Sequence, residues 1–450
     1  MSAGRHFTPT PTLPLAGGGS KATTVLFLMS HSVELPRWMD WGLLPAINLG
    51  LALLVSAAVL LLIGHDPAQV LGLLIKGAFG SRSGLSYTLY YATTFVFTGL
   101  AVAVAFHGGL FNIGGEGQAM MGGLGAGLAA LAWAHLLPAW LMLPLMVLAA
   151  MLFGLAWAAV PAALQAWRGS HIVITTIMFN FIASALMGYL LVNALKEPGN
   201  QAPESRAFGA SARLPGAHEV LAGLGLDWPK TPLNLSVLLA VMAAVAVYLV
   251  LWRSQPGYAL RAVGFSPAAA HYGGIAPRLQ IMRSMMLSGA LAGLVGINEI
   301  AGVHQRVLAE FVAGAGFAGI AVALIGRNHP VGIVLAALLF GALYQGGAEL
   351  SFEIRGFSRD MVFTLQGLIV LFAGAMAQVA APALGRLHRA LRPAAHGAAD
   401  VGLDVGLGVG LRVGLRVGTG TASGSSTVPG AGPVVGSGAG AGAGAGSSHG

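Results

Sequence analysis

The sequence predicts an all-α, polytopic integral membrane protein with about ten transmembrane helices and a disordered C-terminal tail. Two features of the composition carry this prediction: only 8% of the 450 residues are charged, and 56% are hydrophobic. The charged share is about a third of that of a soluble protein, too small to cover a water-exposed surface. The absence of cysteine excludes disulfides, thiolate metal sites and cysteine nucleophiles.

Long apolar stretches, each a candidate membrane span, supply the third observation. A helix needs about 20 apolar residues to cross roughly 30 Å of hydrocarbon. The eighth and ninth stretches are short for a full crossing, so a tilted, broken or re-entrant segment is expected there and eight or nine spans remain the alternative. The stretches run approximately over 43–63, 85–106, 110–134, 138–163, 171–195, 234–252, 284–303, 311–326, 331–348 and 361–380.

The segments outside these stretches suggest how the chain is oriented. Residues 1–42 lack the pattern of a signal peptide, so the first span is expected to direct insertion. A slight excess of arginine near the inner span ends favours both termini in the cytosol. The polar loop 196–233 is then periplasmic, and 381–450, rich in Gly, Ala, Val and Ser, is a cytosolic low-complexity tail, disordered from about 394.

Several kinds of chemistry have no motif in this sequence. The basic residues that give the net charge of +8 are scattered singly and do not form a nucleic-acid-binding face. No Gly-Lys-Ser/Thr phosphate-binding loop, His-Glu-x-x-His zinc pair or Gly-x-Ser-x-Gly nucleophile motif is present within an apolar segment. The sequence therefore predicts no metal site, no catalytic residue and, where ATP drives the process, hydrolysis by another chain.

The first chemical signal along the chain is the string 108–118, which has five glycines among eleven residues, together with Asn112, Glu116 and Gln118. This composition predicts a helix that unwinds beside a polar cavity, where free backbone groups could meet a solute. The alternative, equally weighted for Glu116, is that its carboxylate only binds the broken backbone and braces neighbouring helices.

Other polar residues inside apolar stretches allow the same two interpretations. Asn180 can bond between helices or contact a solute. Glu299 is expected close enough to the outer surface to be solvated, which favours a structural interpretation over a role in the pathway. The small-residue stretches Gly122–Gly127 and Gly289–Gly293 are interpreted as helix-packing surfaces.

The polar loop 254–280 carries a second signal. Ser266 and Pro267 are typical of a helix start, the following alanines sustain it, and Gly273 with Gly274 ends it. A short rigid helix on the cytosolic face is suited to docking another protein, and an ordinary connector is the alternative.

This loop resembles the coupling segment of permease subunits in bacterial ATP-binding-cassette importers, in the branch for nucleosides, simple sugars and branched-chain amino acids. Leu110–Gln118 is similar to the Asn-Ile-Gly-x-Glu-Gly-Gln signature of its nucleoside and simple-sugar permeases. Further similarity lies in 174–180, 288–296 and 319–328 before Pro330. His329 and Phe265 depart from the residues common in the family, which leaves the substrate open.

The resemblance implies a transmembrane permease domain at 43–380 in the bacterial inner membrane. This chain would bind no cofactor, and ATP would be used by a cytosolic ATPase partner. A second, different permease subunit and a periplasmic or lipid-anchored solute-binding protein would complete the importer, surrounded by membrane lipids and without nucleic acid. A nucleoside is the first choice of cargo and a simple sugar the second, and a gradient-driven carrier working alone is the rival.

The same resemblance assigns two sets of residues. One set lines or braces the route of the solute, and the other forms the loop that couples to the ATPase. The first comprises Asn112, Glu116, Gln118, Thr175, Thr176 and Asn180, to which we add Glu299 as a candidate; the second comprises Gly257, Arg261, Ala262, Gly264, Pro267, Ala270 and Gly274.

Overall fold

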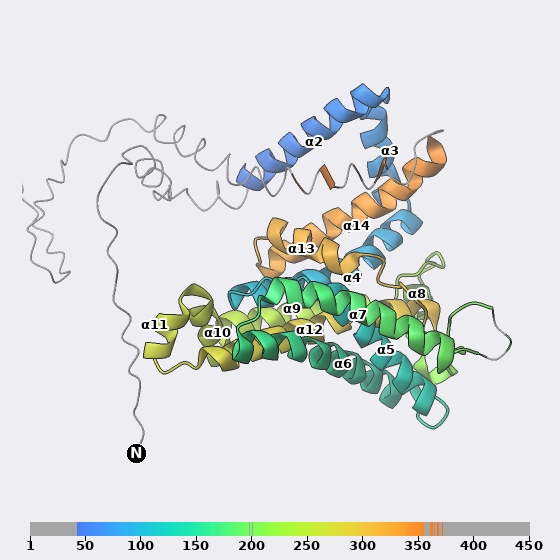
Figure 1. Cartoon of the computed structure of the whole chain (residues 1–450). Helices are drawn as coiled ribbons and strands as arrows, with labels where there is room; N and C mark the ends of the chain where they lie inside the picture. Colours follow the sequence, from blue (N-terminus) through green and yellow to red (C-terminus); the bar gives the residue numbers. More distant parts are fainter. Residues whose placement is uncertain are drawn as a thin grey trace, which may run out of the picture. The chain divides into compact units, whose positions relative to one another are not determined.

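The computed structural model describes residues 43–354, apart from 198 and 200, and scattered positions between 361 and 371 (Figure 1). These residues belong to the first of two units into which the chain divides, Met1–Arg392. The expected N-terminal segment 1–42, most of the tenth expected span and the tail 381–450 lie outside the described residues.

The described residues form helices and no strand, which confirms the all-α fold class. The helices named in Figure 1 are α2 (Leu44–Ile63), α3 (Pro67–Phe79), α4 (Arg82–His107), α5 (Gly115–Trp133), α6 (Ala139–Arg168), α7 (Ile172–Asn193), α8 (Ala217–Gly223), α9 (Ser236–Arg253), α10 (Gln255–Phe265), α11 (Pro267–Tyr272), α12 (Pro277–Gly293), α13 (Ala315–Ile325) and α14 (Pro330–Glu353). Two short segments complete the order: a 3-10 turn, η2 (Ala210–Ala212), and a π-helix, η3 (Ile297–His304).

In the part of the chain that is described, six helices are long and apolar enough to cross a membrane, or seven if the α2–α3 pair, bent by 118°, is one span. The protein is therefore a multi-pass membrane protein, although the described residues alone do not reach the expected ten spans. α5 has 19 residues, but its glycines, Glu116 and Gln118 lower its hydropathy. α13 has 11 residues and rises only about 16 Å, so the eighth stretch is too short to cross, as expected, whereas α14 is full length.

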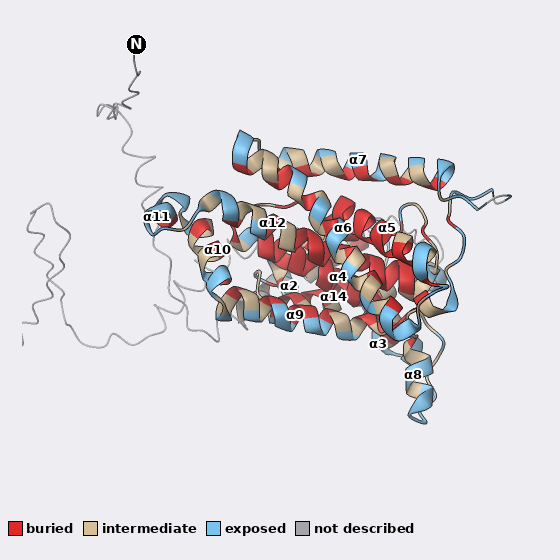
Figure 2. Ribbon diagram, turned by 90° about the horizontal axis from the view of Figure 1, so that it is seen from below, coloured by how far each residue is buried: buried red, intermediate tan, exposed pale blue. Residues whose placement is uncertain are grey.

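The interior is built on α4 and on the continuous segment α12–η3. In the most apolar 18-residue stretch of α4, 83% of the residues are buried, compared with 22% in the corresponding stretch of α6. Figure 2 shows the buried residues concentrated on α4, α5 and α12, with α7 and α9 along the outside. The large apolar side chains exposed on the outer helices suit contact with lipid or with a partner subunit.

Small residues allow the central helices to pack with their backbones close together. α6 packs along α12 and α5. A Cβ atom added to Gly154 would overlap the carbonyl oxygen of Gly289, and one added to Gly122 would overlap the backbone of Gly293. These contacts confirm the interpretation of the small-residue stretches as packing surfaces.

α9 separates two polar regions of the chain. The loop that contains η2 and α8 precedes α9, and the α10–α11 pair follows it. With 18 residues, α9 rises about 27 Å, enough for one crossing. The α8 loop and the α10–α11 pair therefore lie on opposite faces of the membrane domain.

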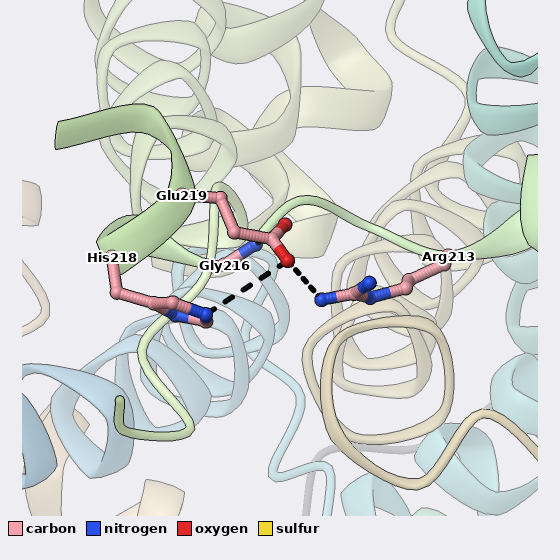
Figure 3. Close-up of polar contacts among 4 residues, drawn as sticks. All are labelled: Arg213, Gly216, His218 and Glu219. Atoms are coloured by element: carbon pink, nitrogen blue, oxygen red, sulfur yellow. Dashed lines mark hydrogen bonds and ion pairs between the residues drawn. The ribbon is translucent and has the colours of Figure 1, made fainter. Parts of the chain in front are cut away.

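The α8 loop is held by polar contacts near the start of α8 (Figure 3). The Glu219 carboxylate accepts the backbone N–H of Gly216 at 3.3 Å and forms an ion pair with Arg213, and His218 Nε2 lies 3.8 Å from Glu219 Oε1. The Gly216 N–H, followed by the Arg213 charge, lowers the pKa of Glu219 below its ordinary value. The ionised form of Glu219 therefore stabilises this turn.

Candidate functional site

The glycine-rich string forms a non-helical break between α4 and α5, over residues 108–114, as predicted. Gly109 has φ = 73°, a conformation that side chains other than glycine rarely adopt. Inside a membrane domain the polar backbone of such a break must find partners within the protein. The neighbouring polar side chains provide them.

Asn112 is the centre of the first set of contacts. It is fully buried, and its Nδ2 donates to Gln118 Oε1 and to Ser288 Oγ, each at 2.9 Å. Its Oδ1 accepts the backbone N–H of Gly114 at 2.8 Å and Gln118 Nε2 at 3.2 Å. Ser288 in turn donates to the carbonyl oxygen of Ala101 at 2.6 Å. The two amides thus tie the break to α4, α5 and α12.

α7 supplies the second set of contacts to the break. Asn180 Oδ1 accepts the N–H of Gly117, and Asn180 Nδ2 donates to the carbonyl oxygen of Ile113, each at 2.9 Å. Thr176 is buried, and its Cβ lies so near Gly114 that a Cβ added there would be 3.1 Å away. Thr175 is not part of this cluster, because it is partly exposed and its hydroxyl donates to Ile172 of its own helix at 3.0 Å.

Glu116 joins the start of α5 to the start of α13. Its side chain belongs to a residue only 6% exposed, and its two carboxylate oxygens accept the N–H groups of Gly314 and Gly316, each at 2.8 Å. A Cβ at Gly316 would overlap the backbone of Glu116, so the two helix starts are in direct contact. A carboxylate is favoured between two helix N-termini because both direct N–H groups and positive partial charge towards it.

Glu299 occupies a separate cluster, and the expectation that it is solvated is wrong: the residue is only 6% exposed. The Tyr90 hydroxyl donates to Glu299 Oε2, and Thr94 donates to Oε1 at 2.8 Å. Asn298 Nδ2 donates to Thr94 Oγ1 at 2.7 Å. The π-helical turn η3 directs Glu299 towards α4 instead of the outer surface.

Several partners in these two clusters were not predicted. They are residues of distant segments that meet a predicted site residue: Tyr90, Thr94, Ser288, Asn298, Gly314 and Gly316. One local signal existed, since Tyr90, Thr94 and Thr98 recur every four residues along one face of an apolar helix.

The 254–280 loop contains α10, α11 and the first residues of α12. Ser254 begins α10 by accepting the N–H of Gly257 at 3.2 Å, and Ser266 begins α11 by accepting the N–H of Ala269 at 3.3 Å. α11 ends at Gly273, and Gly274 has φ = 80°. These bounds confirm the short helix predicted from Ser266, Pro267 and the two glycines.

The α10–α11 pair exposes some of its residues and buries others. Phe265 and Tyr272 are each 92% exposed, whereas Gly257 and Ala270 are buried. Arg261 and Ala262 are half-buried. The pair is therefore partly anchored and leaves three aromatic side chains exposed, of which Phe265 and Tyr272 are the most exposed and Tyr258, at 65%, is the third.

Gly264 connects this pair to the break. A Cβ at Gly264 would overlap the carbonyl oxygen of His107, and one at Gly109 would lie 3.1 Å from the Cα of Gly264. The end of α10 therefore rests directly on the end of α4 and the first residues of the break.

The described residues contain no group of three or more His, Cys, Asp or Glu side chains that could hold a metal ion. The polar groups of the break and of the Glu299 cluster bind one another instead. Apolar helices, an internally satisfied break and an anchored helix pair with exposed aromatic side chains are compatible with a transport protein of the membrane.

Comparison with known proteins identifies the family. The model of the branched-chain amino acid transport system / permease component family matches residues 84–374, and the chain belongs to this family. The chain is 36% identical to the guanosine ABC transporter permease protein of Bacillus subtilis over 331 residues, 73% of this chain and 92% of the relative. It is 35% identical to the glucose ABC transporter permease protein of Haloferax volcanii over 341 residues, 75% and 88% of the two chains.

A third relative, the nucleoside ABC transporter permease protein of Lactococcus lactis, is 31% identical over 339 residues, 73% of this chain and 90% of the relative. The chain is thus the permease subunit of an ATP-binding-cassette importer, and its family implies an ATPase and a solute-binding protein as partners. The resemblance noted in the sequence is confirmed at the level of the family.

Proposed function

We propose that this permease carries a nucleoside or a related small polar solute across the bacterial inner membrane, with a simple sugar as the second candidate. The names of relatives with 31–36% identity, which refer to guanosine, nucleosides and glucose, support this cargo class. Nucleosides and sugars are neutral polyols, which suits a membrane domain with few fixed charges.

The observation that carries the proposed mechanism is the position of the α10–α11 pair. Phe265 and Tyr272 form an exposed aromatic surface, and aromatic side chains are enriched where proteins dock. Behind them, Gly264 rests on the α4–α5 break. An ATPase that binds the aromatic surface would therefore displace the break when it closes on ATP, with Arg261 and Pro267 shaping the contact.

The residues of the break act in this mechanism as braces. Asn112, Gln118 and Asn180 bind one another or the backbone, and Glu116 holds α13 to α5. A movement of the break would consequently be passed to α13 as a unit. The glycine contacts between α6, α5 and α12 would allow these helices to slide between inward-open and outward-open packings.

Docking of a cytosolic ATPase at α10–α11 places this face of the membrane domain in the cytosol. The α8 loop, on the opposite face, is then periplasmic and meets the solute-binding protein. Both termini are cytosolic in this arrangement, in keeping with the arginine distribution. A second, different permease subunit completes the pair of membrane domains, and the chain itself binds no cofactor and performs no covalent chemistry.

The test is to purify the tagged chain in mild detergent and identify its companions by mass spectrometry. The complex is then placed in liposomes, and ATP-driven uptake of guanosine and D-glucose is measured with the solute-binding protein. We expect an ATPase and a second permease to be recovered, and one of the two solutes to stimulate ATP hydrolysis. This chain alone, transporting without ATP, would instead establish a gradient-driven carrier.

Variants of the aromatic surface make the test specific. Phe265→Ala with Tyr272→Ala should remove the ATPase from the purified complex and abolish ATP-driven uptake. The matched control is Trp140→Ala, which removes an aromatic side chain that is 76% exposed at the start of α6. Loss of the ATPase in the control as well would show that exposed aromatic side chains matter only for solubility or insertion.

A further inference from the structure

A polar cavity of about 290 Å³ lies where the end of α3, the start of α4 and the end of α14 meet. Its volume is near the lower end of the roughly 300–1,000 Å³ typical of ligand pockets. Besides Ser81, whose hydroxyl accepts the N–H of Gly84 at 2.9 Å, the polar side chains of the cavity come from all three helices and differ in type: Lys76, Ser83, Tyr87, Gln345, Glu349 and Glu353.

These side chains are not engaged with the rest of the described protein. Neither Lys76 nor the two glutamates take part in an ion pair within the described residues, and Tyr87 and Gln345 make no side-chain hydrogen bond there. The contrast with the break and the Glu299 cluster is complete, because there the polar groups bind one another. These groups of the cavity are therefore available to a solute, and three of them, Lys76, Ser83 and Glu353, belong to exposed residues.

Glycines on α3 and α14 fix the wall of the cavity. A Cβ added to Gly77 would lie 2.7 Å from the Cβ of Glu349, and one added to Gly346 would overlap the carbonyl oxygen of Leu74. α14 therefore packs closely on α3, and the stem of Glu349 is held against Gly77. Glu349 is half-buried, and its Cβ and Cγ lie at the cavity wall against Gly77.

The cavity lies at the end of α4 that contacts the α8 loop. Arg82, at the start of α4, donates to the carbonyl oxygen of Asp227 at 3.1 Å, and Trp228 donates to Ser86 at 2.6 Å. Both partners belong to the segment between α8 and α9. The cavity is thus on the face opposite α10–α11, where a solute would arrive in an importer.

The polar groups of the cavity suit a neutral polyol. A vicinal diol can donate its hydroxyl protons to the carboxylates of Glu349 and Glu353 and accept from Lys76 and the Gln345 amide. The ring of Tyr87 adds an apolar surface of the kind that packs on a sugar face. Two carboxylates against one ammonium disfavour an anion.

We propose that this cavity is an entry site that binds the hydroxyl-bearing ring, the ribose of a nucleoside or a hexose, as the solute leaves its binding protein. The inference rests on the proposed function, since it requires import from the α8 face. It adds a substrate-binding residue set, centred on Glu349 and Gln345, that is separate from the break.

The experiment uses the assembled importer in liposomes with its binding protein and measures the uptake of guanosine and D-glucose. Glu349→Ala and Gln345→Leu should each raise the KM for the carried solute roughly ten- to hundredfold, because a hydrogen bond to a charged or polar group is lost. Recovery of the ATPase in the purified complex should be unchanged. Two further variants test the site even if Glu349→Ala does not fold. Glu349→Gln keeps the shape of the side chain, and Ser83→Trp places a large side chain at an exposed position that lines the cavity.

A hydroxyl-blocked analogue gives a readout that folding does not affect. The wild type should discriminate against 2′,3′-O-isopropylidene guanosine, or against the deoxy analogue if glucose is carried, and Glu349→Gln should discriminate less, with the same binding protein in both assays. The matched control is Glu197→Gln, an exposed carboxylate of the α8 loop outside the cavity.

Three results would overturn the inference. Unchanged KM and unchanged discrimination in all four variants would show that the solute does not bind here. Loss of the binding protein from the complex, with discrimination intact, would show that the cavity docks that protein. Failure of the wild type to carry either solute would refute the proposed cargo itself, and the entry site would fall with it.

Discussion

Replacing Glu116 with glutamine should loosen α13 from α5, because the structure leaves no room for an amide with the same contacts. Both carboxylate oxygens accept backbone N–H groups, from Gly314 and Gly316, each at 2.8 Å. A glutamine can present one oxygen, but its NH₂ group then faces the second N–H, and two donors meet. Leucine at this position leaves both N–H groups without a partner.

The expected magnitudes follow from the number of lost contacts. A hydrogen bond to a charged group contributes about 1.5–3 kcal/mol, and removal of a buried charge returns part of its desolvation cost. We therefore expect Glu116→Gln to lower the free energy of unfolding of the membrane domain by about 1–3 kcal/mol, and Glu116→Leu by about twice that amount. Transport should fall in the same order, since the brace between α5 and α13 weakens.

The assay measures thermal unfolding of the assembled importer and ATP-driven uptake at equal expression. The control is Glu310→Gln, an exposed carboxylate four residues before Gly314. If Glu116→Gln were as stable and active as the wild type, the two-acceptor contact would not be needed, because one side-chain oxygen would then suffice to hold Gly314 and Gly316. Equal loss of uptake in the glutamine and leucine variants, both of normal stability, would show that the charge itself takes part in transport.

Three further predictions concern other parts of the chain. Gly264→Ala places a Cβ against the carbonyl oxygen of His107, so uptake should fall about tenfold while the complex still hydrolyses ATP; unchanged uptake would separate α10 from the break. The lowered pKa of Glu219 means that its stabilisation is present above about pH 4.3, the ordinary value, and is lost as the pH falls through the folded value. Hydrogen-exchange protection of α8 should therefore decrease in acid in the wild type and show no such dependence in Glu219→Gln. Truncation after residue 393 should preserve uptake, because the sequence beyond it predicts no packed core, and loss of uptake in a stable truncated protein would contradict that interpretation.

The break could be predicted from the sequence because its cause is local. Five glycines among eleven residues weaken a helix wherever they occur, and the interspersed Asn112, Glu116 and Gln118 indicate that polar groups are needed there. The ends of α11 were predictable for the same reason, since Ser266, Pro267 and the following glycines act on their own helix.

The partners of the predicted residues could not be found in this way, because they depend on helix packing. Ser288 is 176 positions from Asn112, and Gly316 is 200 positions from Glu116. An apolar pattern around the whole helix does not tell which face meets which neighbour, and in a membrane the outer helices are as apolar as the buried ones. The burial of Glu299 was missed because its position depends on the π-helical turn η3, which has no local sequence signal that we recognise.

The number of membrane spans also could not be predicted from the apolar pattern alone. Hydropathy places a helix near each of the first nine expected stretches, yet α13 is too short to cross and α2 meets α3 at a sharp bend. A short apolar helix is stable inside the membrane only if its exposed ends find partners. Glu116 supplies such partners at the start of α13, so the residue that first suggested a solute pathway also stabilises one end of a helix that does not span.

Polar groups that are hydrogen-bonded within the protein and polar groups without such bonds therefore have different tasks, transmission of movement and recognition of the solute. Groups whose bonds are made within the protein hold irregular backbone in an apolar environment, and breaking those bonds to bind a solute would cost stability at each transport cycle. Groups without protein partners can exchange water for a solute at little cost to the fold. By this argument the break, resting on α10, transmits movement, whereas the cavity around Glu349 and Gln345 recognises the solute, and variants at the two places should alter coupling and apparent affinity independently.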